Sequence, residues 1–324
     1  TSHAFRLTPH ASRFPAANFN GLKKLSLAGF LITFTGAVLF STKAIIVKKA
    51  FADTRIDALT LLTLRMIFSL PFFITAAFLV SSKSGNTRLT KKQWAQIIVL
   101  GLFGYYLSSY FDFAGLQYIS AGLERLILFL YPTFVVLMNR MFFKLKITRT
   151  QLIALLLTYT GIAIAYFDEM MIDTSNPEFY WGSFLIFLCS LTYAFYISGS
   201  GKVIPFTGAS KFTAYAMLSA TMGIFIHYIL RGDYHQLNQI HGMWGYGLIL
   251  AVVATVLPTF MLSAGLARIG SNNVAIISGI GPVSTILQAH WILGEGIHGG
   301  QIIGTVLVIA GVLLTGWKSE SNGN

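Results

Sequence analysis

Long apolar runs fill most of the chain, and short polar connections separate them. Ten of these runs are close to the roughly 20 residues that a helix needs to cross a 30 Å hydrocarbon layer. They are Leu25–Val47, Ala58–Val80, Trp94–Leu116, Ala121–Phe143, Gln151–Phe167, Phe179–Ser198, Phe212–Leu230, Trp244–Leu266, Asn273–Leu293 and Ile297–Trp317. The pattern predicts an all-α membrane protein with ten transmembrane helices and no separate extramembrane domain.

Composition supports the same class. Of the 324 residues, 55% are hydrophobic and only 10% are charged, and the mean hydropathy is +0.68. A water-soluble protein of this length needs more polar material to cover its surface. We therefore expect the lipid bilayer to be the main surrounding of this chain.

The net charge of +12 is explained by its distribution. If the N-terminus is cytoplasmic, fifteen Lys and Arg residues outside the spans fall on the inner side and four, Lys48, Lys49, Arg55 and Arg231, on the outer side. This asymmetry fits the positive-inside rule. It predicts an inner (plasma) membrane protein with both termini cytoplasmic, residues 1–24 as a cytoplasmic tail, and no nucleic-acid partner.

The two halves of the chain are related by a shift of 150 residues. In this register "GLQYI" at Gly115 falls on "GLARI" at Gly265, and Pro132 falls on Pro282. The register indicates a duplication, with one five-helix repeat over residues 25–167 and a second over 179–317. Because five is odd, the second repeat is expected to enter the membrane with inverted orientation, which is an architecture of secondary transporters.

Three stretches resemble EamA-type carriers of the drug/metabolite transporter superfamily. They are "LTLLTLRMIFSLPFF" in the second run, "AGLQYISAGLERLILFLYPTF" across the third and fourth, and "GLARIGSNNVAIISGIGPVSTILQAHWILGEG" across the eighth and ninth. The resemblance spans about 27–316 and implies two inverted five-helix halves, a central cavity and export of small metabolites, amino acids among them. The first half departs from it, because "FKL" at Phe143–Leu145 stands where "LGE" is often found.

Besides Arg140 near the inner end of the fourth span, five charged residues lie inside the predicted spans of the first half. They are Lys43, Arg65, Asp112, Glu124 and Arg125, at a similar depth in the outer part of the membrane. Because a charge near the bilayer centre costs about 2.5–3.5 kcal/mol on insertion scales, each is a functional candidate.

Two interpretations of this charged set stay open. In one, Glu124 or Asp112 pairs with Arg65 or Lys43 as a latch, and Arg125 extends to the headgroups. In the other, a surplus cation binds a substrate carboxylate, and a carboxylate receives an amine or a coupling proton. We assign Lys43 and Glu124 to substrate binding, and Arg65 and Asp112 to structure or gating.

The two related prolines mark a candidate cavity. Pro132 and Pro282 each remove a helical hydrogen bond near mid-span, and backbone groups freed at that depth need protein or a wet cavity around them. The residues that we place beside them in a binding site are Tyr110, Tyr131, Tyr196, Ser278, Gly281 and Ser284. The prolines themselves are assigned to structure or gating.

Enzyme signatures are absent from the sequence, which has no HExxH, GxSxG or Walker motif. With Cys189 as the single cysteine, a cysteine metal cluster is excluded. We expect no catalysis, cofactor or metal. The expected function is export of a small-molecule substrate, with amino acids favoured, by alternating access and with protons as a candidate coupling ion. The alternatives are a carrier of sugar phosphates or nucleotide-linked metabolites, and a membrane scaffold or receptor without transport.

Overall fold

The computed structural model describes residues 27–82, 88–143, 149–172, 177–238, 243–278 and 280–319. Within these ranges the regular structure is entirely helical, with no strand, and the all-α prediction is confirmed. The predicted N-terminal tail, 1–24, lies outside them.

The helices follow one another along the chain with short connections. The first half contains α1 (Leu27–Thr54), α2 (Ala58–Ser81), α3 (Lys91–Gly101), a π-helical segment (Leu102–Leu107), α4 (Ser108–Gly115), α5 (Ala121–Leu128), α6 (Tyr131–Phe143) and α7 (Arg149–Ile172). The second half contains α8 (Phe179–Thr207), α9 (Ala209–Arg231), α10 (Tyr234–Asn238), α11 (Trp244–Ala251), a π-helical segment (Val252–Val256), α12 (Leu257–Ser278), α13 (Gly281–Gln288), another π-helical segment (Ala289–Leu293) and α14 (Gly299–Ser319).

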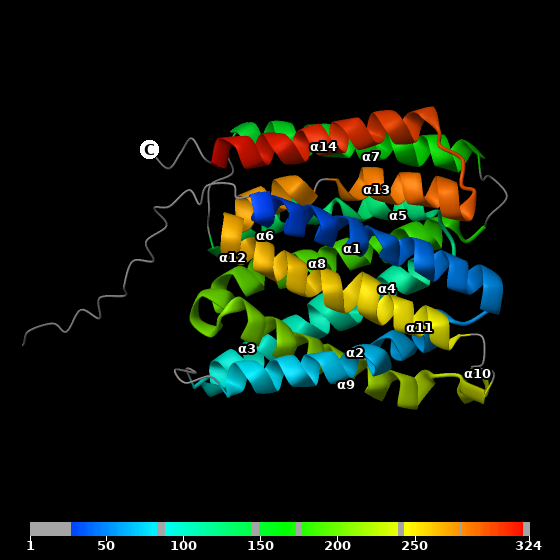
Figure 1. Cartoon of the computed structure of the whole chain (residues 1–324). Coiled ribbons are helices and arrows are strands. Elements are labelled where there is room, and N and C mark those ends of the chain that lie inside the picture. The colour runs from blue at the N-terminus through cyan, green and yellow to red at the C-terminus, as the bar shows by residue number, and fades with distance from the viewer. Residues whose placement is uncertain are drawn as a thin grey trace, which may run out of the picture.

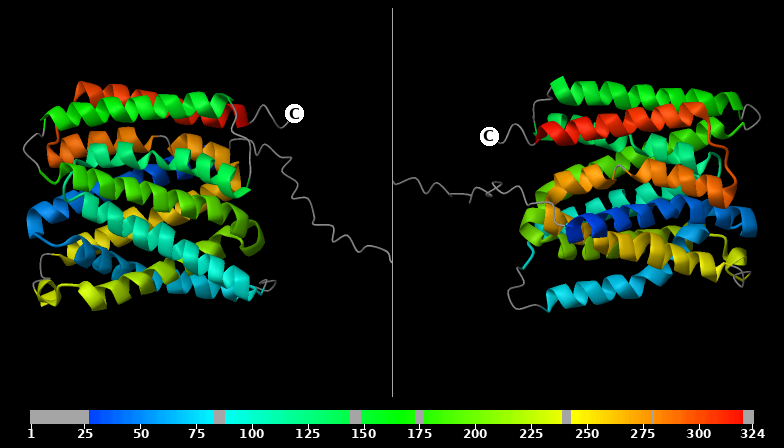
Figure 2. Two further views of the ribbon diagram at one scale, coloured as in Figure 1. Left: turned by 180° about the vertical axis from the view of Figure 1, so that it is seen from behind. Right: turned by 45° about the horizontal axis from the view of Figure 1, so that its top comes forward.

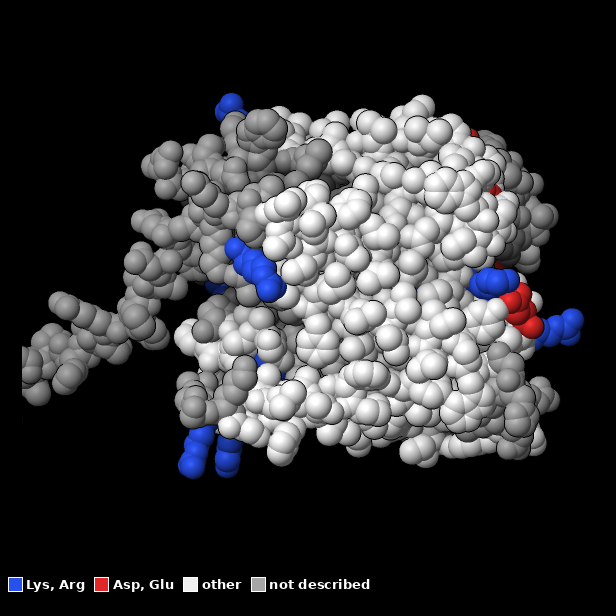
Figure 3. Space-filling model, viewed as in Figure 1, with Lys and Arg blue, Asp and Glu red and all other residues white. Residues whose placement is uncertain are grey.

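The exterior fits a lipid surrounding. Six helical stretches in the described ranges are long and apolar enough to cross a membrane, and Gly299–Gly311 is a shorter apolar helix. In the face shown in Figure 3, Lys, Arg, Asp and Glu gather at the two ends of the bundle and leave an uncharged band between them. Large apolar side chains such as Phe78, Ile229 and Trp291 are exposed, as expected where lipid is the solvent.

The ends of two predicted spans differ from the structure. The connection expected between Leu266 and Asn273 is helical and belongs to α12, and the chain leaves the helix only after Ser278. The polar run there lowers helix propensity modestly, whereas Pro282 removes a hydrogen bond and clashes with the preceding turn. The proline therefore decides where the helix ends.

Backbone irregularities recur at the 150-residue spacing of the sequence repeat. The break between α5 and α6 follows Leu128, and the break between α12 and α13 follows Ser278. The π-helical segments begin at Leu102 and at Val252, again in this register. Related sequences thus give the same local backbone in both halves.

Helices that correspond in the two halves pack against each other. α7 lies beside its counterpart α14 at one edge of the bundle, and α2 beside its counterpart α9 at the opposite edge (Figure 1). The views in Figure 2 show the same arrangement. The α7–α14 contact is close because two glycines face each other, and a Cβ built on Gly304 would lie 2.4 Å from the carbonyl oxygen of Gly161.

This contact leads to a first prediction. Gly304→Ala forces α7 and α14 apart and is expected to lower the free energy of unfolding by about 1–3 kcal/mol, the usual cost of overpacking. The measurement is the midpoint of thermal unfolding of the purified protein in detergent. Gly245→Ala on α11 is the matched control, because a Cβ there meets nothing within 4 Å. Equal stability of the two variants would contradict the close contact.

Candidate functional site

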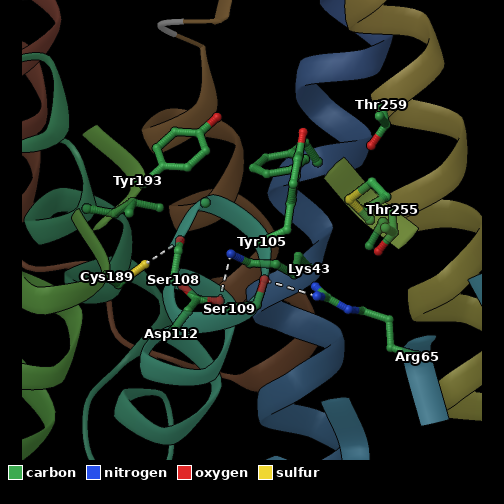
Figure 4. A pocket seen from close by; sticks show the side chains of 15 residues that line it. Lys43, Arg65, Tyr105, Ser108, Ser109, Asp112, Cys189, Tyr193, Thr255 and Thr259 are labelled. Carbon is green, nitrogen blue, oxygen red and sulfur yellow. Dashed lines mark hydrogen bonds and ion pairs between the residues drawn. The ribbon is translucent and has the colours of Figure 1, made fainter. Parts of the chain in front are cut away.

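A buried cavity lies in the middle of the bundle, where α1, α2, the α3–α4 helix, α8 and the α11–α12 helix meet (Figure 4). The space open to the centres of water molecules is about 50 Å³, which is room for a few waters. Its lining residues are Phe40, Lys43, Arg65, Gly104, Tyr105, Ser108, Ser109, Asp112, Leu128, Cys189, Tyr193, Met217, Ala254, Thr255 and Thr259. In this conformation a metabolite can enter only if helices move.

One lysine and two carboxylates form the charged centre of the site. The Nζ of Lys43 on α1 lies 2.7 Å from Oδ2 of Asp112 on α4 and 3.9 Å from Oε1 of Glu124 on α5. The three side chains are 9%, 1% and 0% exposed, respectively. An ion pair with this geometry offsets part of the cost of burying the charges. The predicted pairing of Lys43 with the acids is therefore present.

Arg65 makes no such ion pair. Its Nη2 donates to the Ser109 hydroxyl at 3.0 Å, its guanidinium lies 5.0 Å from the centre of the Phe113 ring, and its Nε has no hydrogen-bond partner. Within the described residues no carboxylate oxygen lies within 4.0 Å of this guanidinium. The expectation that Arg65 helps to close a latch with an acid is not met in this conformation, because Lys43 takes that place.

Arg125 does not extend to the headgroups, and that prediction is wrong. The side chain is buried, and its Nη2 donates to the Ser41 hydroxyl at 3.0 Å. Ser41 in turn donates to the carbonyl oxygen of Gly281 at 3.3 Å. A Cβ on Gly281 would lie 3.1 Å from Arg125 Nη2. Gly281 was predicted to bind substrate by leaving its backbone open to approach. In the structure the side chain that approaches this backbone is Arg125.

Aromatic side chains form the wall of the cavity in two rows. Tyr105 and Tyr193 line the cavity. Behind them, Tyr196 shares a hydrogen bond of 3.1 Å with the hydroxyl of Tyr105, and the ring of Tyr131 packs edge-on against Tyr193 at 5.1 Å. Tyr131 and Tyr196 were predicted to bind substrate, and the structure places them one row behind the cavity wall.

The remaining predicted residues lie away from the cavity. The ring of Tyr110 packs against His227 on α9 at 4.8 Å. The Ser284 hydroxyl accepts a hydrogen bond of 2.8 Å from Gln288 within the same helix, and Ser278 ends α12. None of these three lines the cavity.

The two prolines stand directly after the helix breaks. Pro282 is buried near the start of α13, and Pro132 is the second residue of α6, where its side chain lies outside the described part. Their predicted role in shaping the helices agrees with the position of the breaks, while a role in gating stays a prediction.

Sequence reasoning missed the small hydroxyl residues around the cavity. Tyr105, Ser108, Ser109 and Asp112 follow one another at helical spacing and turn toward the cavity. Residues three, four and seven apart on a helix share one face, so this polar stripe in an apolar span was a usable signal. Thr255 and Thr259 carry the same signal at a spacing of four.

Polar contacts join distant segments at both ends of the bundle. At the end that carries Leu27, the hydroxyls of Ser81 and Tyr215 share a hydrogen bond of 2.7 Å. At the end opposite Leu27 and Ser319, polar contacts tie distant segments together. Tyr246 donates a hydrogen bond to Asp53, the Ala121 amide donates to Glu295 at 3.1 Å, and Lys48 Nζ donates to the Ile119 carbonyl at 2.9 Å.

At the end that carries Leu27 and Ser319, a groove runs along α2 from Ser82 to Pro71 and reaches Phe260 on α12. Phe260 is next to the cavity residue Thr259, and its ring packs against the buried Phe73 at 6.2 Å. Aromatic side chains therefore separate the groove from the cavity.

The buried ion pair gives a second prediction. Lys43→Met leaves two buried carboxylates without their cation and is expected to cost about 3–5 kcal/mol of stability, while Lys43→Met combined with Asp112→Leu recovers most of the loss. Thermal unfolding in detergent measures both. Lys49→Met is the matched control, because its pair with Asp53 is about half exposed and such pairs contribute about 0–1 kcal/mol. If Lys43→Met were no less stable than Lys49→Met, the ion pair would not support the fold.

Comparison with known proteins agrees with this architecture. The sequence profile of the EamA-like transporter family matches residues 27–167 and again 180–317. The uncharacterized transporter YcbK of Bacillus subtilis (strain 168) is 28% identical over 286 residues, covering 86% of this chain and 89% of the relative. The uncharacterized transporter YyaM of the same organism is 25% identical, covering 76% and 81%.

A solved crystal structure shares the fold with a TM-score of 0.63 at 17% identity, covering 89% of this chain and 95% of that chain. The sequence relatives are named as transporters, and the profile covers nearly all of the helical region. The chain therefore belongs to the EamA-like transporter family and is a membrane transporter.

Proposed function

We propose that this transporter exports a small amphoteric or anionic metabolite, with amino acids as the favoured class. The observation that carries the proposal is the guanidinium of Arg65, which lines a buried cavity and has no carboxylate partner among the described residues. A cation held in this way needs an anion to offset its burial. A substrate carboxylate provides one.

Arginine suits this task because its planar fork of donors matches a carboxylate in two-point contact. Ser109 already occupies one Nη2 donor, and other donors of the same guanidinium stay available. The hydroxyls of Tyr105, Tyr193 and Thr255 line the same space and offer oxygen acceptors for a substrate ammonium. Aromatic walls add apolar contact for a side chain.

The charge balance separates this proposal from its main alternative. A sugar phosphate or nucleotide-linked metabolite brings at least two negative charges. The second cation of the cavity, Lys43, is already paired with Asp112 at 2.7 Å. Among the residues that line the cavity, Arg65 is the one cation without a carboxylate partner, which favours a substrate with a single carboxylate. A scaffold or receptor without transport would not need an unpaired buried cation.

The same proposal includes alternating access between two inverted five-helix repeats, 25–167 and 179–317. Support comes from backbone breaks that recur 150 residues apart and from the packing of corresponding helices. With the termini cytoplasmic in the inner membrane, as the charge distribution predicts, the grooved end faces the cytoplasm and accepts the substrate for export.

A third prediction tests the role of Arg65. In proteoliposomes loaded with one unlabelled amino acid, uptake of the labelled form is expected to be saturable for at least one member of a panel. Arg65→Gln should weaken this counterflow by about 10- to 100-fold, because a hydrogen bond to a charged group contributes about 1.5–3 kcal/mol. Arg65→Lys should retain part of it.

The control is Arg231→Gln, which changes an exposed arginine at the end of α9 and should leave counterflow unchanged. Thermal unfolding verifies that each variant is folded. Saturable flux of a sugar phosphate and of no amino acid would overturn the proposed substrate class. An unchanged rate in Arg65→Gln would remove Arg65 from the site.

A further inference from the structure

Glu124 is the most deeply buried acid of the charged centre. Its side chain is 0% exposed, and neither carboxylate oxygen accepts a hydrogen bond from the described residues. The nearest cation, Lys43 Nζ, is 3.9 Å away and lies closer to Asp112. Glu124 is therefore left without a donor of its own.

The charged and titratable groups around Glu124 come from four helices. Lys43 on α1 and Asp112 on α4 belong to the charged centre, and Arg125 follows Glu124 on α5. Cys189 on α8 lines the same cavity as Lys43 and Asp112. The guanidinium of Arg125 donates a hydrogen bond to Ser41. It forms no ion pair with Glu124 within 4.0 Å. α13, which also packs against α5, contains no Asp, Glu, Lys, Arg or His.

Asp112 and Glu124 lie close together, because an oxygen of each is within 4.0 Å of the same Lys43 Nζ, at 2.7 and 3.9 Å. Two neighbouring carboxylates repel each other when both are ionised. One of them therefore tends to keep its proton, and the pair holds one proton in total. One proton on this pair leaves one negative charge opposite Lys43. The charges of these three side chains then cancel inside a low-dielectric bundle.

We propose that Asp112 and Glu124 together form a binding site for one exchangeable proton, and that this proton is the coupling ion of transport. The inference rests on the proposed transport function and adds the driving ion to it. The proton is bound as a carboxyl O–H on the pair and leaves as a hydrated proton when water reaches the site. No other bond changes.

Coupling follows from the position of the pair. Asp112 lines the substrate cavity, and Glu124 is on α5, one of the helices that end at a recurring break. Loss of the proton leaves a second buried negative charge, which favours a conformation that admits water or a substrate ammonium. Proton binding favours the closed arrangement seen here. A ligand that interacts differently with two conformations shifts their populations.

The decisive variant is Glu124→Gln, which has nearly the same shape and mimics the protonated acid without releasing a proton. Glu124, which the sequence assigned to substrate binding, does not line the cavity. The variant should therefore fold, keep the Lys43–Asp112 pair and retain amino-acid counterflow at equal pH on both sides. Accumulation of the amino acid against its gradient, driven by a pH difference with the membrane potential clamped at zero, should be lost. Glu178→Gln, which changes an exposed glutamate before α8, should retain both activities.

The outcomes separate the two proposals. Absence of counterflow for every amino acid overturns the proposed function. Counterflow without pH-driven accumulation in the unmodified protein, or full accumulation in Glu124→Gln, overturns the proton site and leaves the proposed function standing. Infrared difference spectroscopy adds a readout that does not need transport. The unmodified protein should show a protonated carboxyl band that Glu124→Gln lacks, and identical spectra would overturn the inference.

Discussion

The Lys43–Asp112 ion pair determines how the other polar groups of the bundle are arranged. A charge inside lipid must find a partner within the protein, and Lys43 finds two carboxylates on two other helices. Lys43 lies closest to Asp112, and among the described residues the Glu124 carboxylate is left without a hydrogen-bond donor. In the same part of the chain Arg65 has no carboxylate beside it and donates to Ser109 instead. The pair thus joins α1 to α4, and it also leaves the two groups that we assign to proton and substrate binding.

The helix breaks are the second constraint on the site. Each break precedes a proline and exposes backbone carbonyls that need donors in the absence of water. At the break before Pro282, the Ser41 hydroxyl accepts from Arg125 and donates to the Gly281 carbonyl. A Cβ on residue 281 would press against the guanidinium. Duplication of the sequence supplies the breaks in both halves, whereas the charged residues of the site all come from the first half. Symmetric helices therefore hold an asymmetric site.

The helices, the duplication and the gathering of Lys43, Asp112 and Glu124 were predictable, because apolar run length, proline register and depth along a helix can all be read from the sequence. The side-chain partners of Lys43 and Arg65 were not predictable from the sequence. Which cation pairs with an acid depends on the rotation of each helix about its axis. A span that is apolar on every side has no polar face from which this rotation can be read. For the same reason Arg125 was placed at the headgroups, and the cavity hydroxyls were overlooked.

The central claim is that the buried cavity is the substrate path, and Cys189 allows a direct test because this single cysteine lines it. The measurement is its labelling by a small membrane-impermeant thiosulfonate, added to either face of vesicles during transport. If the cavity is the substrate path, Cys189 should be labelled slowly from both faces, and the transported substrate should suppress this labelling. If Cys189 stays unreactive from both faces during active transport, while Ala52→Cys in a Cys189→Ala background reacts at one face, the cavity is not on the path.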